Sequence, residues 1–132
     1  MYKHTEVTER VIGAFYDVYN ALGYGFLEAV YERALTIELG KLGLQVIPQA
    51  RIQVSYAGQV VGDYFADLVV EDKVLVEVKA VRNLHEEHEA QLLNYLKATK
   101  YEVGLLLNFG PQPQLKRKAY DNTRKGSLEW IE

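Results

Sequence analysis

The sequence of 132 residues contains no cysteine, only three prolines and no long apolar segment. The absence of cysteine excludes a disulfide framework, a thiolate metal site and a cysteine nucleophile. No window approaches the roughly 18 apolar residues of a membrane-spanning helix, and the charged start MYKHTEVTER lacks the apolar core of a signal peptide. We therefore expect a cytoplasmic protein that is not inserted into a membrane.

The chain also lacks an overall positive charge. Its net charge of −3 argues against a protein that coats nucleic acid through bulk positive charge. The distribution is uneven, because residues 1–40 hold three basic and six acidic side chains whereas residues 97–125 hold seven basic and two acidic ones. The basic end could contact a polyanion, although ordinary solvated surface lysines would give the same composition.

The composition, 48% hydrophobic and 25% charged, is typical of a globular protein. A chain of this length fits a single domain over residues 1–132, which can bury roughly two-thirds of its unfolded surface. Apolar spacing predicts the element order α-α-β-β-β-α-β. The expected ranges are a helix capped by Thr5 or Thr8 and ending at Gly23, a helix over 27–42, strands over 44–56 (kinked at Pro48), 60–70 and 74–81, a helix over 86–99, and a strand over 103–107. The basic segment past Pro111 is expected to add a short strand or helix.

Three ionisable side chains stand inside the second and third expected strands. Alternation places Asp67 on one face with Phe65 and Val69, and it places Glu77 on one face with Lys79. If residues 71–73 form a three-residue loop, paired positions sum to 144 and Asp67 lies directly across from Glu77. A register shifted by one residue would separate the two acids.

Opposed carboxylates about 5 Å apart repel each other by roughly 3 kcal/mol at an effective dielectric of 20. Lys79 can offset part of this repulsion, and a divalent cation held by both acids would offset more. Ligands made only of oxygen suit Mg²⁺ or Mn²⁺. The simpler interpretation is a surface salt bridge at a strand end, but the acids lie among Val, Leu, Ala and Phe residues, where salt bridges are uncommon.

Several motifs together resemble a known family. Asp67 followed one hairpin later by Glu77-Val-Lys79 is similar to the PD-(D/E)xK nuclease superfamily. The stretch GFLEAVY, from Gly25 to Tyr31, resembles the signature of its GxxExxY group, and QLLNY, from Gln91 to Tyr95, resembles the QxxxY motif of RecB-like exonucleases. The segment VGLLLNFG and the following KRK resemble that group's ending, so the likeness covers residues 5–120. Ala66 stands where the superfamily pattern has proline.

The resemblance implies a fold and a set of roles. The fold would be α/β, with a restriction-endonuclease-like αβββαβ core, a mixed central sheet flanked by helices, and an extra N-terminal helix. Asp67, Glu77 and the carbonyl of Val78 would bind Mg²⁺ or Mn²⁺. Lys79 would orient or help deprotonate the attacking water and stabilise negative charge.

The resemblance also assigns roles on two helices. Glu28 would bind metal or water, although a carboxylate at a helix start is favoured by the helix dipole without any function. Gln91 and Tyr95, four residues apart on one helical face, would contact a phosphate or fix the lysine. Zinc binding by the nearby His85 and His88 is not favoured, because HxxH lacks the HExxH spacing and a third ligand.

These features lead to three functional hypotheses. The first is a metal-dependent nuclease that hydrolyses phosphodiester bonds of DNA with low sequence specificity, any specificity coming from a partner protein or a homodimer. The second is a catalytically silent module of the same fold that binds nucleic acid or a protein, which the presence of Asp67, Glu77 and Lys79 argues against. A purely structural protein would leave the acid pair unexplained.

Overall fold

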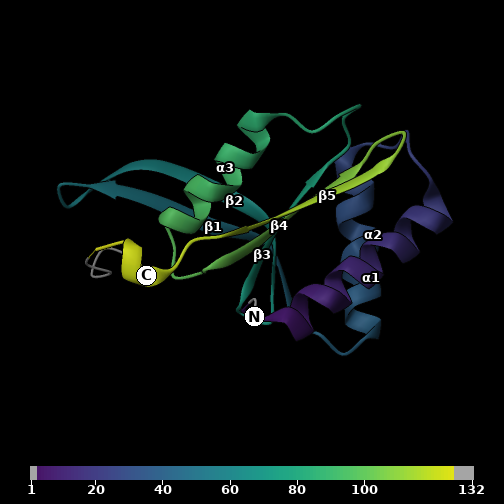
Figure 1. Ribbon diagram of the computed structural model, residues 1–132, viewed down its shortest axis with the longest axis horizontal. Coiled ribbons are helices and arrows are strands. Elements are labelled where there is room, and N and C mark those ends of the chain that lie inside the picture. Colours follow the sequence, from purple (N-terminus) through teal and green to yellow (C-terminus); the bar gives the residue numbers. More distant parts are fainter. Residues whose placement is uncertain (1–2, 127–132) are drawn as a thin grey trace.

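The computed structural model describes residues 3–126, which form a central five-stranded sheet with helices on both faces (Figure 1). The elements, in chain order, are α1 (Thr5–Leu22), α2 (Glu28–Lys41), β1 (Val46–Tyr56), β2 (Gln59–Val70), β3 (Val74–Lys79), α3 (Glu86–Lys97), β4 (Val103–Phe109), β5 (Pro113–Ala119) and a short 3₁₀ helix (Asn122–Arg124). The expected order α-α-β-β-β-α-β is confirmed, and β5 is the short strand expected after Pro111.

The strands lie in the sheet in sequence order, β1-β2-β3-β4-β5. The pairs β1/β2, β2/β3 and β4/β5 are antiparallel, and β3/β4 is parallel because α3 carries the chain from one to the other. The sheet is therefore mixed, as expected. Residues 71–73 form the three-residue loop, and Leu68↔Val76, Val69↔Leu75 and Val70↔Val74 are paired, so the register in which paired positions sum to 144 is confirmed.

Helices α1 and α2 cover one face of the sheet (Figure 1). In α1 the buried positions Val7, Val11, Phe15 and Val18 recur at three- and four-residue steps, so one side of the helix packs on the sheet. In α2 the buried positions are Tyr31, Leu35 and Leu39, whereas the apolar Val30 and Ile37 are exposed. These helices pack on the even-numbered residues of β3, Val74, Val76 and Val78, and on alternate residues of β4.

Helix α3 covers the other face. Its buried residues Leu92, Tyr95 and Leu96 pack against Leu75 of β3 and Leu106 of β4. β3 and β4 are buried on both faces, which explains their nearly continuous apolar sequences.

Two details differ from the expectations. Neither Thr5 nor Thr8 caps α1; the residue before the helix is His4, with a left-handed backbone (φ 55°), and the Thr8 hydroxyl donates to the Thr5 carbonyl. Regular alternation also fails in β2, because Ala66 and Val69 pack on the α3 face while Leu68 packs on the other. Phe65 therefore does not share a face with Val69 as alternation predicted.

The cause is a kink shared by β1 and β2. Pro48 pairs with Leu68 and Ala50 pairs with Ala66, while Gln49 between them has a positive φ of 52°. The kink expected at Pro48 in β1 is thus present, and it is transmitted to the neighbouring strand at Asp67. Beyond it the β1–β2 hairpin extends away from α1 and α2 (Figure 1).

No helix within residues 3–126 combines the length and apolar character that crossing a bilayer requires.

Candidate active site

Asp67 and Glu77 lie one step beyond the last paired residues of β2 and β3. Here the carboxylates bind the backbone of the opposite strand: the Asp67 N–H donates to Glu77 Oε2 and the Val78 N–H donates to Asp67 Oδ2, both at 2.7 Å. Each acid thus satisfies a backbone N–H next to the kink. The predicted opposition of the two acids is confirmed by this exchange of hydrogen bonds.

Both carboxyl groups have raised pKa values. Burial is the main cause for Glu77, and the adjacent Asp67 adds to it, so that the pKa of Glu77 rises to about 8. Burial also raises the pKa of Asp67, against the hydrogen bond from the Val78 N–H and the charge of Lys79. The expected repulsion is therefore present and only partly offset by the lysine.

Lys79 connects this pair to α3. Its ammonium Nζ donates to Gln91 Oε1 at 3.4 Å, so two residues from separate motifs are brought together. One turn along α3, burial raises the pKa of the Tyr95 hydroxyl to about 12, with smaller contributions from Glu77, Tyr64 and Asp67. Tyr95 thus lies close enough to the acids to sense their charge.

Glu28 reaches the same site from the opposite face of the sheet. It is the first residue of α2, and its charge contributes to the raised pKa of Asp67. The loop before it is held by Tyr31, whose hydroxyl donates to the Gly23 carbonyl at 2.7 Å and accepts the Phe26 N–H at 3.2 Å. The Tyr31 ring stacks on Phe109 at 4.2 Å between centroids, so this tyrosine acts in the core and not in the site.

Gly25 is the first residue of the GFLEAVY stretch and has a structural role of its own. Its φ of 114° is a backbone conformation that residues with a side chain rarely adopt. Gly25 therefore lets the chain turn into α2 and bring Glu28 towards Asp67.

The sequence analysis missed Glu32, one helical turn after Glu28. Burial raises its pKa to about 6, and the charge of Asp67 is the next cause. Its Oε1 accepts a hydrogen bond from Gln49 Nε2 at 2.7 Å, which ties α2 to the kink in β1. The spacing of four residues from Glu28 was the available signal, because such residues share a helical face.

The two histidines near α3 form part of its N-terminal cap. The His85 N–H donates to His88 Nδ1 at 3.0 Å.

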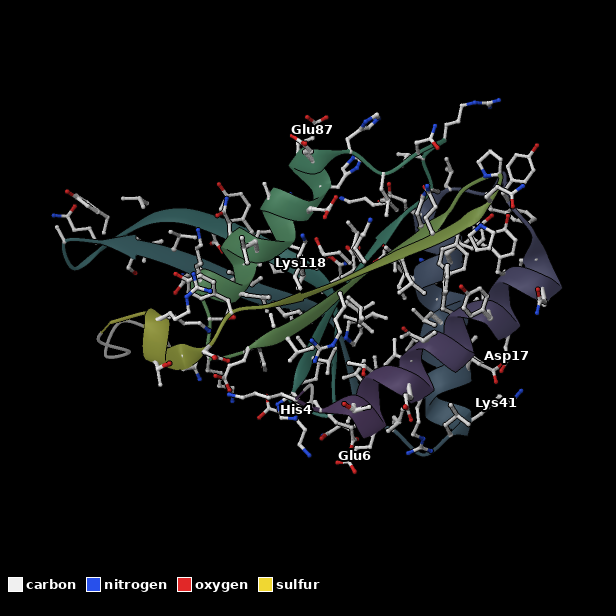
Figure 2. The ribbon with its side chains drawn as sticks, viewed as in Figure 1. His4, Glu6, Asp17, Lys41, Glu87 and Lys118 are labelled. Atoms are coloured by element: carbon white, nitrogen blue, oxygen red, sulfur yellow. The ribbon has the colours of Figure 1, made fainter. Side chains whose placement is uncertain are left out.

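The basic end of the chain is partly neutralised within the fold. Lys100 pairs with Asp72 at 3.0 Å, and Lys118 pairs with Glu89 at 2.8 Å. Figure 2 labels Lys118 on β5. Lys125 donates to the backbone carbonyls of Thr99 and Tyr101. Less positive charge therefore remains for a polyanion than the sequence indicated.

The donor set fits a small hard cation. In both Asp67 and Glu77, one carboxylate oxygen accepts a hydrogen bond from a backbone N–H. The other oxygen takes no part in these two hydrogen bonds. Two adjacent acids with raised pKa values favour a bound cation, since the cation offsets the repulsion. Among residues 3–126 no three His, Cys, Asp or Glu side chains are grouped as a metal site. The two acids would therefore need further oxygen ligands, such as a backbone carbonyl or water.

Comparison with known proteins identifies the class. Residues 5–119 match the sequence profile of the PD-(D/E)XK nuclease superfamily, so the chain belongs to that superfamily. The observed α/β architecture is that of the restriction-endonuclease-like fold.

One solved structure has a similar fold. The crystal structure of SSO0001 is similar with a TM-score of 0.55 and 17% sequence identity, over 70% of this chain and 50% of that one. This chain thus spans about half the length of SSO0001, and the likeness shows the fold. No curated protein matches the sequence significantly.

Proposed function

We propose that the protein is a metal-dependent nuclease that hydrolyses phosphodiester bonds of DNA with low sequence specificity. The observation that carries the proposal is the arrangement at the end of β3. The buried Glu77 and the half-buried Asp67 bind each other's strands, and Lys79, on the same strand as Glu77, contacts Gln91. Membership in a nuclease superfamily supports it.

Asp67, Glu77 and the carbonyl of Val78 would hold Mg²⁺ or Mn²⁺, with Glu28 contributing through a further oxygen or through water. When bound, such an ion lowers the pKa of a coordinated water and offsets negative charge on the phosphate. Lys79 would orient the attacking water and stabilise the charge that develops on the phosphate oxygens. Gln91 would keep the lysine in place.

Low sequence specificity follows from the size of the fold. Reading a sequence requires side chains that reach base edges in a groove. The elements around the acids are the central strands and two helices that also form the core, so few side chains are left to read bases.

The test is cleavage of linear and circular DNA, single and double stranded, with Mg²⁺, Mn²⁺ or EDTA. Lys79→Ala is compared with Lys73→Ala, which removes an exposed lysine from the β2–β3 loop of the same hairpin. We expect cutting by the wild type and by Lys73→Ala, inhibition by EDTA, and loss of about 100-fold or more in Lys79→Ala. Circular substrate separates internal cutting from cutting at ends.

Cleavage that is equal in Lys79→Ala and in the wild type would contradict the assigned site. An absence of cleavage on every substrate would favour the second hypothesis, a nuclease-like module that binds without cutting.

A further inference from the structure

A groove lies between the outer part of the β1–β2 hairpin and α3. Figure 1 shows the ribbons of these two elements. Its volume of about 560 Å³ lies within the range of cavities that hold small organic ligands. One wall is formed by Val54, Ser55 and Tyr64 of the hairpin. The other is one side of α3, formed by Glu87, Ala90, Gln91, Asn94, Tyr95, Lys97 and Ala98.

Tyr64 is the exposed aromatic side chain in this groove. Tyr64 is 47% exposed and pairs across β1 with the buried Ile52. Its ring centroid is 5.7 Å from that of Tyr95. A Cβ atom added at Gly62 would come within 2.8 Å of the ring, so the ring lies across this glycine. Tyr64 thus lies over Gly62 and next to Tyr95, with a large part of its surface open.

The groove shares Gln91 and Tyr95 with the candidate active site. Gln91 lines the groove and accepts the hydrogen bond from Lys79, and Tyr95 lines it while sensing the charge of Glu77 and Asp67. A chain bound with one phosphate at the acid pair would therefore place an adjacent nucleotide in the groove.

The charges along α3 fit that orientation. Lys97 lines the end of the groove far from Glu87, and its Nζ lies 5.5 Å from the centroid of the Tyr120 ring. The guanidinium of Arg124 lies 4.3 Å from the same ring, so two cations meet at this end and can attract a phosphate. Figure 2 shows the acidic Glu87 at the opposite end of α3, where a phosphate would be repelled.

We propose that this groove binds an unpaired nucleotide of the substrate strand, with its base stacked on Tyr64 and the next phosphate near Lys97. The inference rests on the proposed nuclease function and names its substrate class, single-stranded nucleic acid. A base within a duplex has both faces covered by its neighbours, whereas an unstacked base can lie against an aromatic ring. Amides and hydroxyls such as Asn94 and Ser55 tolerate any base, which agrees with low sequence specificity.

Binding is measured separately from cleavage, by fluorescence anisotropy of a labelled 12-nucleotide oligothymidylate in EDTA. A 12-base-pair duplex is the comparison. We expect tighter binding of the single strand, weakened about tenfold by Tyr64→Ala and retained by Tyr64→Phe, because stacking requires the ring and not the hydroxyl. Phe65→Ala is the matched control, since this neighbouring aromatic is 53% exposed but does not line the groove.

Ala90→Glu supplies an independent test from the α3 wall, with a residue that favours helix and adds a negative charge. It should also weaken binding of the single strand. Equal affinity in Tyr64→Ala and wild type, or equal affinity for duplex and single strand, would overturn the proposal. Because no metal or cleavage is involved, loss of the nuclease hypothesis alone would leave these binding results unchanged.

Discussion

The two ends of the β2–β3 pair show how one hairpin can serve two purposes. Near the loop, Leu68, Val69 and Val70 face Val76, Leu75 and Val74 in a regular register, and all six are fully buried. One residue further, the opposed positions are acids, and their carboxylates bind the backbone of the facing strand. Stability comes from the first end, and the candidate chemistry is confined to the second.

The difference shows what the acids cost the fold. At the apolar end burial is favourable without further conditions. At the acidic end burial disfavours the ionised form, so Glu77 has a pKa of about 8 and holds a proton at neutral pH in the absence of metal. A cation bound at the proposed metal site would displace this proton.

The largest expected effect comes from removing a charge at the acidic end. Glu77→Gln preserves shape and can still accept the Asp67 N–H, but it loses the negative charge that a metal ion requires. We expect cleavage to fall by about 100-fold or more, while the metal-free protein stays folded. Rates under saturating Mg²⁺, together with circular dichroism, test this. Rates within threefold of wild type would show that Glu77 has no role in the chemistry.

The opposite result is expected at the apolar end. Leu75→Ala leaves a cavity beneath α3, where Leu75 packs with Leu92 and Leu106. Unfolding free energy should fall by about 3–5 kcal/mol, whereas cleavage per folded molecule should change little. Urea denaturation and rates at low temperature measure the two quantities. A stable variant with low activity would mean that the two ends are not separable.

The stability of the metal-free protein should depend on pH in the direction that the raised pKa values set. Glu77 has a higher pKa in the folded protein than the ordinary glutamate value of 4.5, so the folded state binds more protons between pH 5 and pH 8. Stability is therefore greatest at the acidic side of this window and falls as the pH rises, by roughly 2–4 kcal/mol. Glu32, with a pKa of about 6, contributes in the same direction.

Urea denaturation at several pH values, with and without Mn²⁺, provides the measurement. Mn²⁺ should reduce the fall in stability, and Glu77→Gln should flatten the profile. A stability that rises with pH through this window would contradict the assignment of the raised pKa values.

The smallest effect is expected at Glu32. Glu32→Gln removes a negative charge near Asp67, and an amide can keep a hydrogen bond to Gln49. The pKa of Asp67 should therefore fall, and the protein should gain less than about 1 kcal/mol at pH 8. NMR titration of the carboxyl carbons reports the pKa, and Glu38→Gln, on the same helix, is the control. An unchanged Asp67 titration would place Glu32 outside the electrostatic reach of the site.

Much of the acidic end was predictable, because register follows from loop length. A three-residue loop between Val70 and Val74 sets the pairing and so brings Asp67 across from Glu77. The position of Phe65 was not predictable by the same rule, since alternation assumes a straight strand and Gln49 has a left-handed backbone.

Contacts between distant segments were also beyond the sequence. Gly25 to Tyr31 indicated Glu28 but not that the Tyr31 hydroxyl holds the preceding loop. Glu32 was overlooked because its partners come from β1 and β2, and only the fold brings those strands to α2. The basic end appeared available for a polyanion because its acidic partners, Asp72 and Glu89, lie far away in the sequence.

The exchange of hydrogen bonds between Asp67 and Glu77 has a consequence for anyone who redesigns this hairpin as an inert scaffold. Each acid completes the backbone of the other's strand, so replacing one by an apolar residue strips an N–H of its acceptor. The route from an acidic to an apolar pair therefore passes through an intermediate less stable than either end point. Both positions must be changed in a single step, together with a new backbone pairing at the kink.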